Sequence, residues 1–180
     1  MIYTNLYDSP LGMMTLACED QAIVGVWFND QKYFGSNLRS NLIKEVEVKE
    51  HPLFDETKRW LNLYFSGKEP DFLPPLRYDC STTFRKMVWD ILLTIPYGQV
   101  MTYGEIAEQI AFKLNVKKMS AQAVGGAVGH NPISILIPCH RVIGTNGSLT
   151  GYAGGIERKK KLLEIEKSFD HNGLKCKSTR

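Results

Sequence analysis

The segment ILIPCHRVIG, residues 135–144, ends an apolar run with a cysteine that directly precedes a histidine. A free thiol has a pKa of about 8.5 and is mostly protonated at neutral pH, so its reactivity depends on the thiolate fraction. His140 could take the proton of Cys139, and a carboxylate on the other imidazole nitrogen could orient the ring and stabilise its charged form. We therefore expect a reactive cysteine at position 139, with a pKa depressed by this arrangement.

The residues around this pair leave more than one chemistry open. Arg141 adds positive potential, and Glu164 and Glu166 follow in the next helical pattern as candidate carboxylates. A Cys and His pair also serves in thiol hydrolases. Unreactive cysteine is usually a small buried hydrophobe, which is our interpretation of Cys18. The four cysteines, Cys18, Cys80, Cys139 and Cys176, form no C-x-x-C pair, so neither a disulfide framework nor a zinc site is indicated.

Composition and charge narrow the class of protein. No segment approaches the roughly 18 apolar residues that span a bilayer, and the first residues lack a secretory signal pattern, so we expect a cytoplasmic protein. Residues 1–80 hold 8 Lys and Arg against 12 Asp and Glu, whereas residues 81–180 hold 14 against 7. A positive field around the cysteine favours a polyanion such as nucleic acid, although runs such as ERKKK are also typical of solvated helix faces.

The elements that must position the cysteine form two groups. Residues 13–18 and 22–28 are strand-like and joined by the turn EDQ, and residues 51–67 have the apolar spacing of an amphipathic helix. The proline-rich stretch 68–79 coincides with the change in charge sign. We place the domain boundary near residue 80 and expect an α+β fold.

The second group is predicted to be mainly helical. Ser81 or Thr82 can cap one helix, Thr102 and Glu105 form a capping-box pattern, and Ser120 can cap a third helix. The helices over 102–110 and 120–130, with the polar, basic stretch KLNVKKM between them, resemble a helix-turn-helix. We then expect a buried extended run over 133–138, a glycine-rich loop over 144–155 and a closing helix over 156–168.

The helix after Ser120 consists almost entirely of tiny residues. Gly125 and Gly126 each cost a helix about 1 kcal/mol relative to alanine, so something must compensate. Close packing against a neighbouring helix is one explanation. The other is that small side chains let the helix backbone approach a narrow surface such as a DNA minor groove.

Taken together, AVGGAVGHNPISIL, IPCHRVIG and NGSLTGYAGGIERKKKLLEIE resemble the active-site region of the O6-alkylguanine-DNA alkyltransferases, also called methylated-DNA-protein-cysteine methyltransferases. The resemblance runs from about Phe84 to Glu166, and SPLGMMTL and GVWF match the N-terminal part of that family more loosely. It implies a β-rich, ribonuclease H-like domain over residues 1–80 and a helical DNA-binding and alkyl-transfer domain with a helix-turn-helix over residues 81–180. It implies no metal and no organic cofactor.

The resemblance also implies roles for individual residues in the reaction. Cys139 would accept the alkyl group of O6-alkylguanine, with O4-alkylthymine as an alternative substrate, and would do so once per molecule. His140 would be its base through a water, and Glu166 would hold His140. Asn131 would brace the active-site turn, and Tyr103 would rotate the target phosphate and protonate the departing guanine.

The resemblance assigns further residues to the flipped base and to the duplex. The base pocket would be formed by Val128, Tyr152, the backbone of Ala153, and the carbonyls of Cys139 and Val142. DNA would be contacted by Ala121, Gln122, Ala123, Gly125, Gly126 and Arg141. The implied partner is double-stranded DNA containing O6-alkylguanine, bound by a monomer.

Two features depart from the family pattern. Gln122 stands where the pattern usually has an arginine that enters the duplex, and the connector AFKLNVKKM is longer than usual. A non-catalytic sensor of alkylated DNA is the main competing interpretation, but such relatives carry tryptophan in place of the cysteine. A thiol hydrolase has no further support in the sequence.

Overall fold

The computed structural model describes residues 1–38, 51–78, 82–170 and 173–174. It divides into two compact units, one of Met1–Cys80 with Pro132–Leu136, the other of Ser81–Asn131 with Ile137–Arg180. Cys80, Cys176 and the candidate cap Ser81 lie outside the described residues, as does the point at which we placed the boundary. No helix in the described part of the chain is long and apolar enough to cross a membrane.

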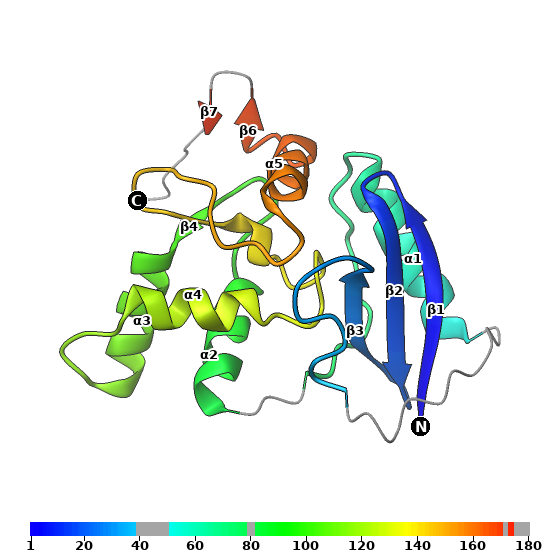
Figure 1. The fold of residues 1–180 in the computed structure, drawn as a ribbon, viewed down its shortest axis with the longest axis horizontal. Helices are drawn as coiled ribbons and strands as arrows, with labels where there is room; N and C mark the ends of the chain where they lie inside the picture. Colours follow the sequence, from blue (N-terminus) through cyan, green and yellow to red (C-terminus); the bar gives the residue numbers. More distant parts are fainter. Residues whose placement is uncertain (39–50, 79–81, 171–172, 175–180) are drawn as a thin grey trace. The chain divides into compact units, whose positions relative to one another are not determined.

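The first unit is built on a three-stranded antiparallel sheet with the order β1-β2-β3 (Figure 1). Its elements are β1 (Ile2–Ser9), β2 (Gly12–Glu19), β3 (Ala22–Phe28) and the helix α1 (Pro52–Phe65). The β2–β3 hairpin and α1 follow the predicted pattern, whereas β1 was not predicted. The helix buries one stripe of side chains, formed by Leu53, Phe54, Thr57, Trp60, Leu61 and Tyr64.

A segment distant in sequence extends this unit. The backbone N–H of Val26 on β3 donates to Pro132 at 2.9 Å, and the N–H of Ser134 donates back to Val26 at 2.8 Å. This parallel bridge pairs Val26 with Ile133, which is fully buried. Backbone hydrogen bonds thus hold the start of the predicted extended run within the first unit, but Ile135 and Leu136 form a turn in which Ile135 has a φ of 72°. The expectation of one extended run over 133–138 is therefore wrong beyond Ser134. The first unit therefore contains a segment that lies well beyond residue 80 in the sequence.

The second unit is mainly helical (Figure 1). Its helices are α2 (Thr83–Leu92), α3 (Tyr103–Leu114), α4 (Ala121–Gly129), α5 (Ile156–Ile165) and the 3₁₀ turn η1 (Cys139–Arg141). Short strands β4 (Met101–Thr102) and β5 (Val142–Ile143) pair in parallel, and β6 (Phe169–Asp170) pairs with β7 (Gly173–Leu174). The sheet in one unit and the helices in the other confirm the predicted α+β class.

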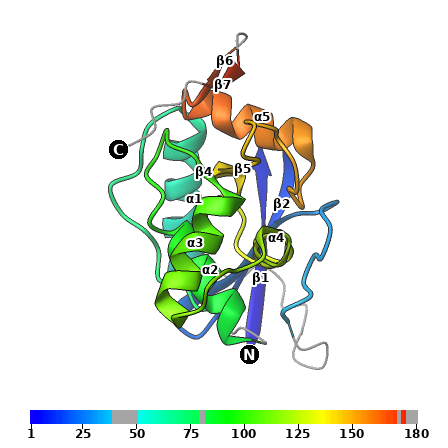
Figure 2. The same cartoon turned by 90° about the vertical axis from the view of Figure 1, so that its left-hand side faces the viewer.

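Local capping explains where the helices of the helix-turn-helix begin. The Thr102 hydroxyl accepts from the N–H of Glu105 while the Glu105 carboxylate accepts from the N–H of Thr102, as the capping box predicted. Ser120 caps α4 through the N–H of Ala123. Helix α3 continues past the predicted end to Leu114 and stops at Asn115, whose φ of 53° is left-handed. Figure 2 views α4 nearly along its axis, with α2 and α3 beside it.

Candidate active site

Cys139 begins the 3₁₀ turn η1 and is buried, with 4% of its surface exposed. Its backbone N–H donates to Ile137 at 2.8 Å, and the N–H of Arg141 donates to Pro138 at 3.0 Å. Pro138 has no backbone N–H, and the chain turns at the cysteine that follows it. The thiol is therefore presented by a rigid, buried turn.

Asn131 fixes the thiol from the end of the helix-turn-helix. Its side-chain amide donates to the carbonyl of Ile137 at 2.8 Å and to Sγ of Cys139 at 3.1 Å, and Asn131 is 4% exposed. Because Asn131 lies two residues beyond α4, this contact ties the turn to that helix. A donor aimed at sulfur stabilises a thiolate more than a thiol.

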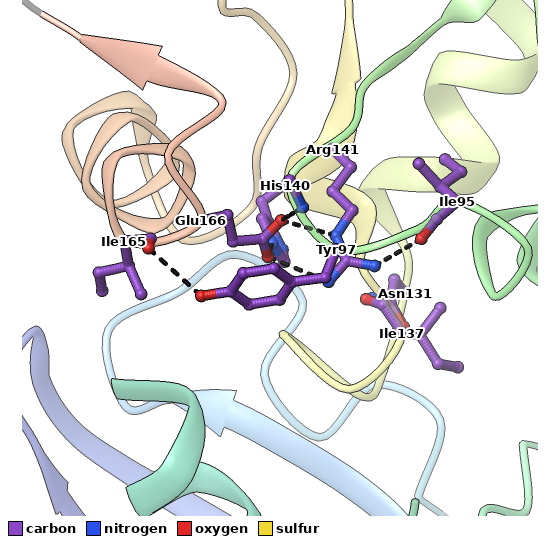
Figure 3. Close-up of polar contacts among 9 residues, drawn as sticks. Ile95, Tyr97, Asn131, Ile137, His140, Arg141, Ile165 and Glu166 are labelled. Carbon is purple, nitrogen blue, oxygen red and sulfur yellow. Dashed lines mark hydrogen bonds and ion pairs between the residues drawn. The ribbon is translucent and has the colours of Figure 1, made fainter. Parts of the chain in front are cut away.

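Glu166 holds His140 in place (Figure 3). Nε2 of His140 lies 2.7 Å from Oε1 of Glu166, and both side chains are fully buried. An ionised carboxylate can only accept, so Nε2 carries a proton and Nδ1 of the neutral ring is the basic nitrogen. The predicted orienting carboxylate is thus present, 26 residues along the chain from the histidine.

Arg141 completes the shell around the same carboxylate (Figure 3). Its Nε donates to Oε2 of Glu166 at 2.9 Å, and its remaining nitrogens reach Oε1 and the carbonyl of Ile95. The backbone N–H of Gly98 donates to Oε2 at 3.0 Å. We expect Arg141 to contact DNA, but the residue is only 9% exposed and its side chain donates within this network. Its role here is to hold Glu166.

The charge states within this buried pair follow from their surroundings. Burial alone would raise the pKa of Glu166, but the charges and hydrogen bonds of His140 and Arg141 outweigh it and lower the pKa to about 2. Burial lowers the pKa of His140, and the attraction of Glu166 only partly opposes this. At neutral pH the pair is therefore a neutral imidazole hydrogen-bonded to a carboxylate.

The thiol differs from what the sequence led us to expect. Burial raises the pKa of Cys139, and the favourable contacts with Asn131, Lys159 and nearby backbone N–H groups do not overcome it. The expectation of a depressed pKa is wrong for the protein without a bound substrate, because a motif contains no information about desolvation. In this state Cys139 is a thiol, and its proton must leave during the reaction.

Tyr103 and the buried Lys159 donate to the same backbone carbonyl. The Tyr103 hydroxyl donates to the carbonyl of Thr150 at 2.8 Å, and Nζ of Lys159 donates to the same carbonyl at 2.6 Å and to that of Val142 at 2.5 Å. Lys159 is fully buried. Burial lowers its pKa to about 8, with the charge of Cys139 acting in the opposite direction.

Lys159 was missed at the sequence level because it lies in the run ERKKK, which is typical of a solvated face. A usable signal was its position three residues before Leu162 and four before Leu163, on the buried face of α5. Tyr103, in contrast, was predicted. Burial chiefly, and the charge of Cys139, raise its pKa to about 12, so the hydroxyl keeps its proton at neutral pH.

The predicted base-pocket residues lie in the second unit. Val128, Val142 and Tyr152 are buried, and Ala153 is half-buried in the glycine-rich loop. That loop comes close to Tyr103 at Gly151, which has a φ of 72°, and a Cβ added there would lie 2.6 Å from the Tyr103 hydroxyl oxygen. The glycine therefore permits both the backbone conformation and the approach of the tyrosine.

The exposed face of helix α4 carries mostly small side chains. Ala121, Gln122, Ala123 and Gly126 are exposed, whereas Val124, Ala127 and Val128 are buried. A Cβ added at Gly126 would have no neighbour within 4 Å, so packing within the unit does not require this glycine. Gly125 is half-buried, and a Cβ added there would lie 3.8 Å from the Tyr103 ring, which is an ordinary contact distance. The outer face thus fits close approach to an external surface, with Gln122 as its largest side chain.

Within the described residues, no group of three or more His, Cys, Asp or Glu side chains is placed to hold a metal ion. The assembled groups are instead a thiol, an imidazole and carboxylate pair, a phenol and an ammonium. These can move protons, and the sulfur can act as the nucleophile in a displacement.

Two family models cover nearly the whole chain. The 6-O-methylguanine DNA methyltransferase DNA-binding domain matches residues 83–168, and the ribonuclease-like domain of the same family matches residues 2–78. Among curated relatives, the methylated-DNA–protein-cysteine methyltransferase of Mycobacterium tuberculosis is 44% identical over 168 residues, covering 93% of this chain and 94% of its own. That of Methanosarcina acetivorans is 40% identical over 167 residues, covering 93% and 99%.

Solved structures are similar in the same way. M. tuberculosis OGT in complex with DNA has a TM-score of 0.77 at 42% identity, over 92% of this chain and 93% of that one. The O6-methylguanine-DNA methyltransferase of Pyrococcus kodakaraensis has a TM-score of 0.65 at 27% identity, over 92% and 99%. The similarity therefore extends through both units.

Proposed function

The chain belongs to the 6-O-methylguanine DNA methyltransferase family, and we propose that Cys139 is the residue to which it transfers the alkyl group of O6-alkylguanine in DNA. As a member of this family it is a DNA-binding methyltransferase that repairs alkylated DNA by direct reversal. The observation that carries the assignment of the acceptor is the contact of 3.1 Å between the Asn131 amide and Sγ of Cys139, next to the buried His140–Glu166 pair.

The chemical step is a displacement at the alkyl carbon. The thiol proton of Cys139 passes through a water to Nδ1 of His140, and the sulfur attacks the alkyl carbon as the bond from that carbon to guanine O6 breaks. Guanine leaves with the electron pair and takes a proton from the Tyr103 hydroxyl. The products are a thioether on Cys139 and an unmodified guanine, and the proton held by His140 restores Tyr103.

The electrostatics of the site support this order of events. Cys139 is a protonated thiol in a buried turn, so thiolate forms only when a base and stabilising donors act together. Glu166 stabilises the imidazolium that His140 becomes, and the Asn131 amide and the Lys159 ammonium stabilise the charge on sulfur. We assign Lys159 as a positioning residue, because it holds the carbonyls of Val142 and Thr150.

The reaction occurs once per molecule. A thioether has no bond that water readily hydrolyses, and no described group is placed to remove the alkyl group. The protein is therefore consumed stoichiometrically. This distinguishes it from a thiol hydrolase, in which a thioester would turn over.

The alkyl carbon is hidden inside a duplex, so the nucleotide must be extruded at a cost of a few kcal/mol. We propose that the exposed face of α4 enters the minor groove, with Gln122 in the space left by the flipped base. Val128, Val142, Tyr152 and Ala153 would line the pocket that receives it. We propose that the protein acts as a monomer, because the second unit of a single chain supplies every group that this step requires.

The test is intact-protein mass after incubation with a duplex containing O6-methylguanine. One added methyl group per molecule, located on the Cys139 peptide and absent in Cys139→Ala, supports the proposal. DNA binding by the wild type without any mass change would replace it with a non-catalytic sensor of alkylated DNA. Release of product in excess of protein would indicate an enzyme that turns over.

A further inference from the structure

Three exposed apolar side chains lie close together in the sequence where α3 ends. Phe112 has 87% of its surface exposed, and Leu114 and Val116 are 47% and 46% exposed. We call residues 112–118 the α3–α4 tip; it comprises the last residues of α3 and the start of the connector to α4. Figure 1 shows this connector projecting from the ends of the two helices. Covering a phenyl ring exposed to this extent would remove apolar surface from water, so contact with a partner would be favourable here.

The charge of the tip restricts what that partner is. Lys113, Lys117 and Lys118 are exposed and alternate with the apolar side chains. From residue 109 to residue 131 the sequence has these three lysines and no aspartate or glutamate. A purely positive segment that also presents an aromatic ring is complementary to nucleic acid, which offers phosphates beside apolar sugars and bases.

The tip is continuous with the face of α4 that we assign to DNA. A cavity of about 750 Å³ lies between α3 and α4, lined by small residues of α3, by Lys117 and Lys118, and by Ser120 and Ala121 at the start of α4. Glu108 is the acidic side chain at its edge. Gln122 follows Ala121 directly. A strand whose nucleotide is contacted by Gln122 would therefore pass next to these lysines.

We infer that the α3–α4 tip is a second DNA-contact element, in which Lys113, Lys117 and Lys118 bind phosphates of the duplex next to the site of α4 and Phe112 packs on a sugar of the same strand. The inference rests on the proposed binding of α4 to DNA. Phosphate contacts do not depend on the base, so the tip contributes equally to binding of alkylated and unmodified duplex. These contacts add affinity for DNA and so compensate for the positive charge that the neutral Gln122 does not provide.

The test is the salt dependence of binding to an unmodified duplex, which avoids the chemical step. The plot of log affinity against log salt loses about 0.9 in slope for each phosphate contact removed. The triple variant Lys113→Ala, Lys117→Ala, Lys118→Ala should therefore have a slope shallower by about 2.7. The matched control replaces exposed lysines of the first unit, Lys32→Ala with Lys68→Ala, and should leave the slope unchanged. An unaltered slope in the triple variant overturns the inference.

A second variant separates DNA from a protein partner. Phe112→Ser changes a side chain that is 87% exposed, so the fold should tolerate it. It should weaken duplex binding several-fold without altering the salt slope. If instead the wild type self-associates on sedimentation, and Phe112→Ser abolishes association while duplex affinity stays the same, the tip is a contact between copies of this chain and the inference is wrong.

Transfer from a free O6-alkylguanine base separates this inference from the proposed function. The triple variant should react with the free base at the wild-type rate, because no duplex is involved. If the triple variant shows normal transfer and an unchanged salt slope, the tip is not a DNA contact, and the alkyl-transfer proposal still stands. Absence of transfer in the wild type from both the free base and the alkylated duplex would remove the proposed function itself.

Discussion

Lys159 and Tyr103 meet at a single carbonyl oxygen, that of Thr150, which accepts from the lysine ammonium at 2.6 Å and from the tyrosine hydroxyl at 2.8 Å. The ammonium also lies 5.9 Å from the centre of the Tyr103 ring. A buried charge thus orders the glycine-rich loop, the β5 backbone and the Tyr103 side chain together. The site depends on this lysine as well as on the residues of its motif.

Lys159→Met should slow alkyl transfer at neutral pH, because it removes a positive charge that favours the Cys139 thiolate. The pKa of Lys159 is about 8, so the wild-type advantage should be largest below pH 8 and should narrow above it as the ammonium loses its proton. Transfer from a free O6-alkylguanine base, measured from pH 6 to 9.5, tests this. Lys161→Met, at an exposed position of the same helix, is the control. If Lys159→Met lost the same fraction of the rate at every pH, the role of Lys159 would be structural and not electrostatic.

Wild-type transfer should itself accelerate with rising pH. Burial raises the pKa of Cys139, so the thiolate fraction of the free protein keeps increasing through the neutral range. The rate of reaction with the free base should rise from pH 6 and reach no plateau below about pH 8.5, the ordinary thiol value. A plateau near pH 6 would instead mean that the thiolate already exists in the resting site.

Glu166→Gln should destabilise the fold in a pH-dependent way. A carboxyl whose pKa is about 2 when folded contributes stability that is present above its unfolded pKa and is lost as the pH falls through the folded value. A shift of this size corresponds to about 3 kcal/mol. Urea unfolding should give the largest difference between wild type and variant above about pH 5, narrowing toward pH 2. Glu108→Gln, at an exposed position, should show no such trend, and parallel curves for Glu166→Gln would contradict the assignment.

The Gly151→Ala substitution should lower the stability of the fold by more than backbone strain alone accounts for. A non-glycine residue in the left-handed region costs about 1–2 kcal/mol, and at this position the added Cβ would also displace the Tyr103 hydroxyl. Gly67→Ala is a matched control, since Gly67 has a φ of 76° and no neighbour within 4 Å of an added Cβ. Both variants should lose thermal stability from strain, Gly151→Ala more than Gly67→Ala because of the contact with Tyr103, and only Gly151→Ala should slow transfer from DNA. Equal transfer rates in the two variants would mean that the position of Tyr103 is not critical.

Gln122→Arg should speed repair of a duplex substrate. Arginine is longer than glutamine and carries a fixed charge that can pair with phosphates and base edges, so it should hold the extruded state more firmly. Gln122 is exposed on α4, so the substitution should not disturb packing. Second-order transfer rates on duplex and on free base separate the effects, since the free base needs no extrusion. An unchanged or slower duplex rate would remove the intercalating role from residue 122.

Several features of this protein were readable from the sequence because their causes are local. Helix boundaries at Thr102 and Ser120 follow from a hydroxyl bonding an N–H three residues later, and the β2–β3 hairpin follows from strand-like runs around a short polar turn. The Cys139–His140 pair is contiguous, so its chemistry could be proposed directly. The sequence offered Glu164 and Glu166 as candidate carboxylates, and the family resemblance selected Glu166 and supplied Asn131.

Only the tertiary structure decided how these groups are arranged and charged. Arg141 is adjacent to the motif, yet it holds Glu166 instead of facing outward, and Lys159 is buried although its neighbours in sequence are polar. The raised pKa of Cys139 reverses the expectation from the motif. The physical reason is common to all three: burial and long-range hydrogen bonds bring together residues far apart in the chain, and desolvation of a charge depends on everything packed around it.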